Sequence, residues 1–257
     1  MTARRSASFA TAALCLTAVW PLAASAAAAS QGTLGDVLFG QMAPDDRPAP
    51  LPPVARFVSD EGESFVLDRS TPTPLMRFEE SPEVLVLSPS PASRGDVIYR
   101  DDLGEPVLRM TRLGGLTLFA HSRSGGTPAA MMGHAMGLGR LAPLSATALV
   151  VRLYQASARA SHAARRLIPF DAQEVTPGAE AVFADAAAVS AEAVVRLSHR
   201  RDGKKMVARF NRVLFLPGRS ADVQMANGAI NVTVAPSQGL AGRPSSARIV
   251  EVALRSR

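Results

Sequence analysis

The sequence contains almost no cysteine. Cys15 is the only one among 257 residues, and it lies in an apolar segment near the N-terminus. A chain that loses this segment has no thiol, so it can form no disulfide and can use no thiolate as a nucleophile or metal ligand. Its stability must come from an ordinary hydrophobic core, for which about 200 patterned residues are sufficient.

Aromatic residues and lysines are also scarce. Aromatic residues make up 5% of the chain, and Lys204 and Lys205 are its only lysines. The core must therefore depend on leucine, valine, methionine and closely packed alanine. A nucleic-acid-binding surface concentrates basic residues in a stripe and interleaves them with aromatics. The arginines of this chain are scattered, so nucleic acid is not an expected partner.

The apolar run near the N-terminus is too short to span a membrane. It extends from Phe9 to Leu22, follows the basic pair Arg4-Arg5, and ends at small residues around Ala26. A spanning helix needs roughly 20 apolar residues, whereas a charged head, a short apolar run and a small-residue exit are typical of a cleaved secretory signal. We therefore predict a signal peptide over residues 1–26, cleaved after Ala26 or, alternatively, after Ala29.

Cleavage of this signal would place the mature chain in the periplasm or outside the cell, without a transmembrane segment. It would also remove Arg4 and Arg5, the only charged residues of the signal, and lower the formal net charge from +6 to +4. Residues 27–55 are rich in alanine and then in proline, a composition that favours extended, poorly packed chain. We predict that they form a tether.

Residues 56–119 have the pattern of short strands joined by polar turns. Apolar runs flank the turn-forming clusters Asp60-Glu61-Gly62 and Asp101-Asp102-Leu103-Gly104-Glu105, and a further run ends at Phe119. This pattern predicts an antiparallel β meander. The glycine- and methionine-rich residues 122–143 are predicted to form a loop.

The period then changes to that of helices. Apolar residues recur at spacings of three and four from Leu149 to Leu167, and Pro169 ends the pattern. Thr176 and Pro177 provide the cap and first turn of a second helix, which continues to Leu197. The short connection and the alanine-rich faces predict a closely packed antiparallel helical hairpin.

Strand patterns return after the second helix. Residues 206–216 alternate in polarity, Asn227-Gly228 separates two β-rich runs as in a tight hairpin, and residues 247–254 are predicted to form a last strand. The order is a β meander, a helical hairpin and further antiparallel strands. It predicts a single α+β domain over residues 56–257.

Residues 56–130 also carry a resemblance. Its clearest segments are Phe65–Ser70, Leu75–Glu79, Arg94–Arg100, Asp102–Arg109 and Thr111–Phe119. They resemble the corresponding segments of an uncharacterised family of exported bacterial proteins that share a domain of unknown function. The resemblance implies export and brings no catalytic residue, ligand or partner.

One cluster has the composition of a soft-metal site. Met132, His134 and Met136 lie close together in sequence, with His121 nearby. Thioether and imidazole ligands suit copper(I), but methionine also fills irregular gaps in protein cores. A copper site is therefore an alternative to ordinary packing at these residues.

Hydrolase chemistry would require a nucleophile next to a base. Ser122 and Ser124 lie close to His121 but lack the Gly-x-Ser-x-Gly elbow. Asp101, Asp102 and Glu105 could pair as acid and base or bind a cation, although acids are ordinary in a turn. A cell-envelope hydrolase would need a pocket that joins His121 to a serine and a carboxylate.

Three further motifs have simpler interpretations. Gly137-Leu138-Gly139-Arg140-Leu141-Ala142 matches a dinucleotide fingerprint in letters but lacks the preceding strand and the following acid. Arg94-Gly95-Asp96 is typical of a turn. The basic run from His199 to Lys205 is predicted to be a solvated loop, or a contact for an anionic polymer.

The sequence thus predicts a non-enzymatic exported protein that binds another envelope component, a protein or a polymer. No catalytic residue and no cofactor is predicted. The two alternatives are copper binding through Met132, His134 and Met136, and the cell-envelope hydrolase.

Overall fold

The structure is a computed structural model that describes residues 51–119 and 125–255. The chain divides into two units, Met1–Arg47 and Pro48–Arg257, and the described residues belong to the second. The predicted signal peptide over residues 1–26 and the tether up to residue 50 lie outside the described residues.

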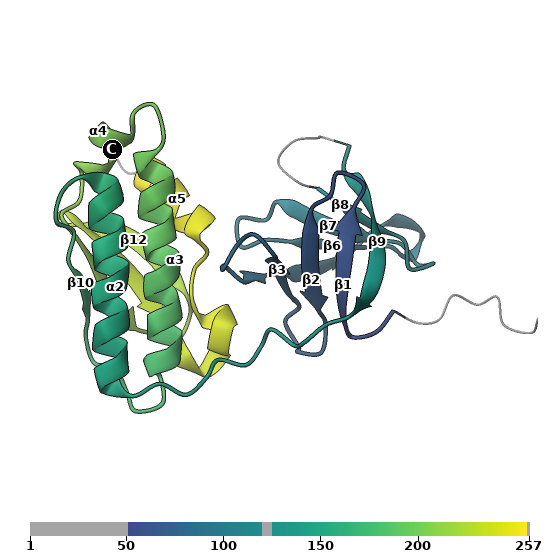
Figure 1. The fold of residues 1–257 in the computed structure, drawn as a ribbon, viewed down its shortest axis with the longest axis horizontal. Coiled ribbons are helices and arrows are strands. Elements are labelled where there is room, and N and C mark those ends of the chain that lie inside the picture. Colours follow the sequence, from purple (N-terminus) through teal and green to yellow (C-terminus); the bar gives the residue numbers. More distant parts are fainter. Residues whose placement is uncertain (1–50, 120–124, 256–257) are drawn as a thin grey trace, which may run out of the picture. The chain divides into compact units, whose positions relative to one another are not determined.

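The first half of the described chain forms one antiparallel sheet of nine strands (Figure 1). In spatial order the strands are β4-β3-β2-β1-β9-β8-β7-β6-β5. Only Leu87 separates the outermost strands β4 and β5 in the chain, so the sheet must curve until its two edges approach each other. The strands are β1 (Val54–Ser59), β2 (Ser64–Asp68), β3 (Leu75–Phe78), β4 (Leu85–Val86), β5 (Ser88–Pro91), β6 (Val97–Arg100), β7 (Pro106–Met110), β8 (Leu116–Leu118) and β9 (Thr127–His134).

The curved sheet encloses its own hydrophobic core. The rings of Phe57 and Phe65 stack with centroids 5.5 Å apart, and Phe78 meets Phe65 edge-on at 6.0 Å. Inward residues alternate along the strands, as expected for a sheet with one buried face. The buried members of this core are Ala55, Phe57, Phe65, Leu67, Met76, Leu87, Tyr99, Leu108, Leu116 and Leu118.

Helices and a second sheet make up the second half. Its elements are α2 (Ala146–Ala164), β10 (Phe170–Ala172), α3 (Glu180–Ser198), α4 (Gly203–Val207), β11 (Arg212–Pro217), β12 (Asp222–Ala226), β13 (Ala229–Val234) and α5 (Ser246–Arg255). The sheet order is β10-β11-β13-β12. β10, β11 and β13 are mutually parallel, and only β12 pairs antiparallel with β13.

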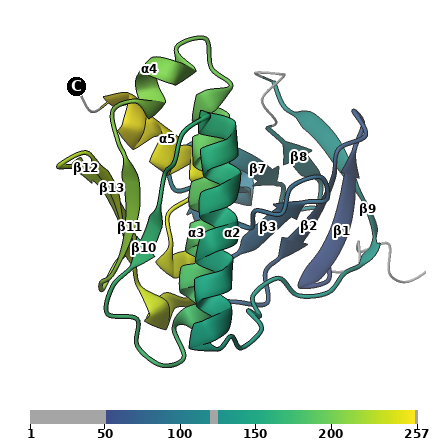
Figure 2. The same ribbon diagram turned by 60° about the vertical axis from the view of Figure 1, so that its left-hand side comes forward.

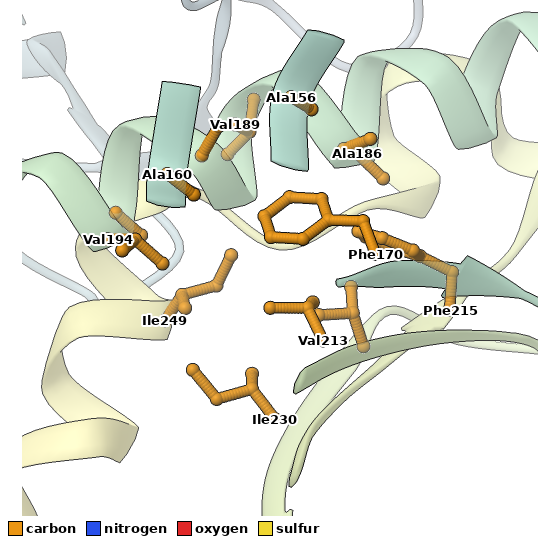
Figure 3. Packing of buried hydrophobic residues seen from close by; sticks show 14 of the residues in the cluster. Ala156, Ala160, Phe170, Ala186, Val189, Val194, Val213, Phe215, Ile230 and Ile249 are labelled. Carbon is orange, nitrogen blue, oxygen red and sulfur yellow. The ribbon is translucent and has the colours of Figure 1, made fainter. Parts of the chain in front are cut away.

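The three longer helices cover one face of this sheet (Figures 1 and 2). Figure 3 shows the core between them, where Val213, Phe215 and Ile230 rise from the sheet toward side chains of the helices. Ala156 and Ala160 of α2 and Ala186 of α3 are buried. Small side chains at these positions allow the helices to approach closely, which confirms the prediction of alanine-dependent packing.

The strand β10 returns the chain along α2. After α2 ends, the Ile168 amide donates to Ser161 Oγ at 2.9 Å, and Ser157 Oγ donates to the Ile168 carbonyl at 2.8 Å. The chain therefore runs back beside the helix that it has just left, and α3 starts at the opposite end. The helices α2 and α3 are consequently parallel: Arg159 in the second half of α2 pairs with Glu192 in the second half of α3. The predicted antiparallel hairpin was wrong.

The α+β class is confirmed, but four local predictions were wrong. Residues 127–134 of the predicted loop form β9, and α4 (residues 203–207) includes residues 206 and 207, where a strand was expected to begin. The final strands are mixed rather than antiparallel, because β11 pairs in parallel on both sides. Residues 247–254 are helical in α5.

Capping explains why the last segment is a helix, although a strand was predicted. Ser245 precedes α5, and its Oγ accepts from the Arg248 amide at 3.0 Å. This is the bond of a serine N-cap. Ile249 and Ala253 are buried one helical turn apart, so the apolar pattern that alternates in sequence also fits one helical face.

The cap is tied to residues distant in sequence through two carboxylates. Asp102 accepts from the Ser245 amide at 2.8 Å and from Ser245 Oγ at 2.6 Å. Glu83 accepts from the Ser246 amide at 2.8 Å and from its hydroxyl at 2.5 Å. Each carboxylate thus holds one serine by two charge-assisted hydrogen bonds.

A buried arginine completes this connection. Arg243 is 3% exposed, donates from Nε to Asp185 of α3 at 2.5 Å, and donates from Nη2 to the Val84 carbonyl at 2.8 Å. A buried guanidinium requires such partners, because removal of one would leave an uncompensated charge. The segment from Arg243 to Ser246 therefore joins α3 to the strand-forming half of the chain.

A buried carboxylate fixes the chain after β9. Asp68 is fully buried at the end of β2, and it accepts from the Ser70 amide, the Ser70 hydroxyl and the Leu138 amide at 2.9, 2.6 and 2.7 Å. Burial alone would raise the pKa of Asp68, but these hydrogen bonds outweigh burial and hold the pKa below its ordinary value. The glycine-rich run after β9 thus binds a carboxylate of its own chain, which accounts for its resemblance to a phosphate-binding loop.

Replacement of this carboxylate should make the protein less stable and less sensitive to acid. We expect Asp68→Asn to lower the free energy of unfolding at pH 7 by about 1–3 kcal/mol, because an amide group would face buried N–H donors. Since the pKa of Asp68 is lowered in the folded state, its contribution is complete above the unfolded pKa and is lost as the pH falls below about 4. The free energies of unfolding of the variant and the original protein, measured with urea, should therefore differ less at pH 3.5 than at pH 7. Asp60→Asn, at an exposed turn, is the matched control, and an equal loss in both variants would contradict the assignment.

Candidate functional site

The second half of the described chain contains an open pocket of about 770 Å³. It lies where the C-terminal ends of α2 and α3 meet the start of α4. We refer to it as the basic pocket, because its polar lining consists mainly of arginine, lysine and histidine. Its lining residues are Arg159, His162, Ala163, Ala164, Arg165, Val195, Ser198, His199, Gly203, Lys204 and Val207.

The parallel course of the helices brings these residues together. His162 and Arg165 belong to the end of α2, whereas His199 and Lys204 follow the end of α3. Both helices have 19 residues and are about 28 Å long. In an antiparallel hairpin the two groups would lie at opposite ends, separated by about that distance.

Gly203 allows α4 to begin directly against the end of α3. A Cβ atom at this position would lie 2.5 Å from the Ser198 carbonyl oxygen and 2.6 Å from that of Leu197. Such contacts are too short for any side chain, so glycine is required for this close approach. The next residue, Lys204, is thereby held at the wall of the pocket.

Arg165 has an unfavourable backbone conformation. It is the C-cap of α2 and has a φ of 53°, in the left-handed region where glycine is the usual residue. For other residues this conformation costs about 1–2 kcal/mol. A strained residue at the rim of a pocket is consistent with a role for its side chain in binding.

The charge of the pocket exceeds what the helix ends require. Each helix C-terminus carries about half a negative elementary charge, which nearby cations balance. Glu192 pairs with Arg159, and both side chains are partly exposed, so this pair adds little stability. Arg165 and Lys204 remain to balance the two helix ends, and the adjacent Arg200, Arg201 and Lys205, with Asp202 among them, add a net charge of +2.

The polar side chains that line the pocket are mainly hydrogen-bond donors. Its one hydroxyl, on Ser198, donates to the Val194 carbonyl at 2.7 Å. No carboxylate is among its lining residues. The arrangement can therefore bind an anion by charge and by N–H donation.

The sequence had indicated one wall of this pocket and missed the other. The basic run from His199 to Lys205 was identified as a possible contact for an anionic polymer, and three of its residues, His199, Gly203 and Lys204, line the pocket. Arg159, His162 and Arg165 had no such signal, because they are dispersed along a helix whose direction relative to α3 was wrongly predicted.

The proposed copper ligands lie on the curved sheet and after it. Met132 and His134 belong to β9, and Met136 follows it. Met132 is 66% exposed and Met136 is 89% exposed. The pairing of β9 with β1 is interrupted between Arg56 and Phe57, which leaves Met132 without a partner residue in the register. Copper binding by these side chains stays a prediction.

The hydrolase residues fall largely outside the structure. His121, Ser122 and Ser124 lie outside the described residues. Among residues 51–119 and 125–255 there is no group of three or more histidine, cysteine or acidic side chains placed to hold a metal ion.

The acidic candidates have structural partners. Asp101 Oδ1 accepts from the amides of Leu103 and Glu105 and thereby closes the β6–β7 turn, while burial raises its pKa. Asp102 is bound to Ser245, as described above. Asp96 accepts from Arg109 Nε at 2.8 Å, and the hydrogen bonds from Arg109 lower the pKa of Asp96. Arg94 and Gly95 form the turn predicted for that motif.

Comparison with known proteins gives one match. A family model described as a domain of unknown function, DUF4908, matches residues 34–253. The match covers both sheets and reaches into α5. No curated protein and no solved structure matches the chain. Within the described residues, the structure has no helix that is both long and apolar enough to cross a membrane.

The strain at Arg165 can be tested by stability measurements. We expect Arg165→Gly to leave the free energy of unfolding unchanged or to raise it by up to about 1 kcal/mol, because glycine removes the left-handed strain but adds chain entropy in the unfolded state. Arg94→Gly is the matched control, since Arg94 has a φ of 63° and is exposed. Chemical denaturation of both variants would measure the effect. A clear loss of stability in Arg165→Gly alone would show that this side chain serves the fold rather than a ligand.

Proposed function

Because the chain belongs to the DUF4908 family, which is described only as a domain of unknown function, we propose a function from the geometry of the basic pocket. The protein is a non-enzymatic exported protein that binds an anionic component of the cell envelope. The basic pocket is the binding site.

The observation that carries this proposal is the convergence of two basic helix ends on one pocket. Arg165 and His162 contribute from α2, and Lys204 and His199 contribute from the chain after α3. The volume of about 770 Å³ falls within the range of small-molecule sites. Guanidinium and ammonium groups favour phosphate and carboxylate, which they bind by charge-assisted hydrogen bonds.

The environment of the carboxylates supports a binding role over catalysis. Asp68, Asp102 and Glu83 accept two or three hydrogen bonds each from their own chain. A general base must be free to approach a substrate proton. The export part of the proposal rests on the N-terminal sequence, in which a basic head precedes an apolar run and small residues.

Loss of two cations from the basic pocket should weaken binding to a polyanion. We expect Arg165→Gln/Lys204→Gln to bind inorganic polyphosphate at least about tenfold more weakly than the original protein, because each lost hydrogen bond to a charged group contributes more than 1 kcal/mol. Isothermal titration calorimetry at low and moderate salt would measure this. Binding by the original protein should weaken as salt is added.

The matched control removes the same charge elsewhere. Arg77→Gln/Arg94→Gln changes two exposed arginines of the strand-forming half and should retain binding. An equal loss in both double variants would mean that net charge alone attracts the polymer, and the proposed site would be wrong.

Export can be tested by the mass of the mature protein. The chain expressed from Met1 should be recovered outside the cytoplasm with its N-terminus at Ala27 or, by the alternative cleavage, at Ser30. Replacement of Leu14 and Leu16 by arginine should block processing, because the apolar run is what the export machinery recognises. Intact mass spectrometry distinguishes the forms. Recovery of the uncleaved chain from the cytoplasm would contradict the proposed location.

A further inference from the structure

The exposed face of α2 is unusually apolar. Val150 is 64% exposed, Val151 50% and Tyr154 75%. The solvent face of a helix on a globular protein is normally polar. These three residues therefore form an apolar surface that no described part of the chain covers.

This surface leads directly to the basic pocket. Val150, Tyr154, Ala158, Ser161 and Arg165 recur at spacings of four, four, three and four, so they follow one line along the helix. We call this line, together with the neighbouring Val151, the α2 stripe. It begins with large apolar side chains and ends at the strained, cationic Arg165 at the rim of the pocket.

A further apolar residue extends the stripe beyond Arg165. Two other arginines of the helix, Arg152 and Arg159, lie about 140–180° around the helix from Val150 and Tyr154, and Arg159 pairs with Glu192 of α3. Leu167 follows Arg165 by two residues and is 78% exposed. Exposed valine, tyrosine and leucine side chains that lead to an arginine have the composition of helices that lie at the surface of a membrane containing anionic lipids.

We infer that the α2 stripe docks on the surface of a membrane with anionic lipids, and that lipid phosphates enter the basic pocket. This inference rests on the proposed function, since it names the anionic component as a lipid headgroup. Val150, Tyr154 and Leu167 enter the boundary between headgroups and acyl chains, and Arg165 and Lys204 bind the phosphates.

The size and charge of the stripe favour a lipid surface over a second copy of the chain. A stable protein interface buries about 800 Å² on each partner, whereas the stripe offers three large apolar side chains. An anionic membrane needs only shallow insertion of these side chains, and its phosphates can contact Arg165 at the end of the stripe.

The test is co-sedimentation with lipid vesicles. The full-length protein, purified after processing, should bind vesicles of phosphatidylcholine with phosphatidylglycerol and should bind phosphatidylcholine alone much more weakly. Val150→Ser/Tyr154→Ser should reduce binding to the mixed vesicles by at least about fivefold, because two apolar anchors are lost. The same variant should bind polyphosphate as the original protein does.

The matched control is Leu113→Ser/Met136→Ser, which changes two other exposed apolar residues, 76% and 89% exposed, and should keep vesicle binding. Equal loss in both variants, equal binding to both kinds of vesicle, or no binding to the mixed vesicles would overturn the inference. Formation of a dimer that Val150→Ser/Tyr154→Ser abolishes would assign the stripe to a second copy and would also overturn it. Polyphosphate binding distinguishes the failure of this inference from the failure of the proposed function. If the protein binds polyphosphate but not vesicles, the basic pocket is still an anion site and only membrane docking is wrong. If it does not bind polyphosphate, the proposed function itself is wrong.

Discussion

The direction of one short strand determines which residues of the second half of this protein meet at one pocket. β10 has three residues, and it lies between α2 and α3 in the chain. Because it returns along α2, both helices must run in the same direction, and their C-terminal ends meet at the basic pocket. Without this return, the basic residues of the two helices would lie about 28 Å apart, and neither group alone would line a pocket.

Parallel helices place two negative dipole ends side by side, which is unfavourable unless cations lie near them. Arg165 and Lys204 therefore have two effects, since the charge that offsets the helix ends also attracts anions. The backbone conformation of Arg165 helps to distinguish a role in balancing the helix end from a role in attracting anions. A helix end can be balanced by a cation elsewhere in its last turn, and glycine would fit the left-handed cap of α2 without strain. The fold therefore does not require an arginine at the cap itself, which is why we propose that the Arg165 side chain serves a ligand.

The local elements could be predicted from the sequence, whereas their directions could not. The spacing of Leu149 and Leu153 identified α2, and Asn227-Gly228 identified the β12–β13 turn, where both residues have positive φ. Periodicity says nothing about how two helices are oriented, and a strand of three residues behind Pro169 is too short to show alternation. The residues of α5 alternate in polarity like a strand, and only the cap at Ser245 and its bonds to Asp102 reveal the helix. For this reason one wall of the basic pocket could be expected from the run after His199, and the other could not.

The distribution of acidic residues completes the explanation of the pocket. The chain as a whole has only a modest positive charge of +6, which by itself would not favour an anion at one place over another. Many of its carboxylates are engaged inside the fold: Asp68 holds the chain after β9, Asp96 pairs with Arg109, and Asp185 pairs with Arg243. Acids used in this way cannot balance cations at a distance, because exposed charges are screened beyond about 10 Å at ordinary salt. No carboxylate is among the residues that line the basic pocket, and the proposed binding of anions depends on this separation of acids from the cations Arg165 and Lys204.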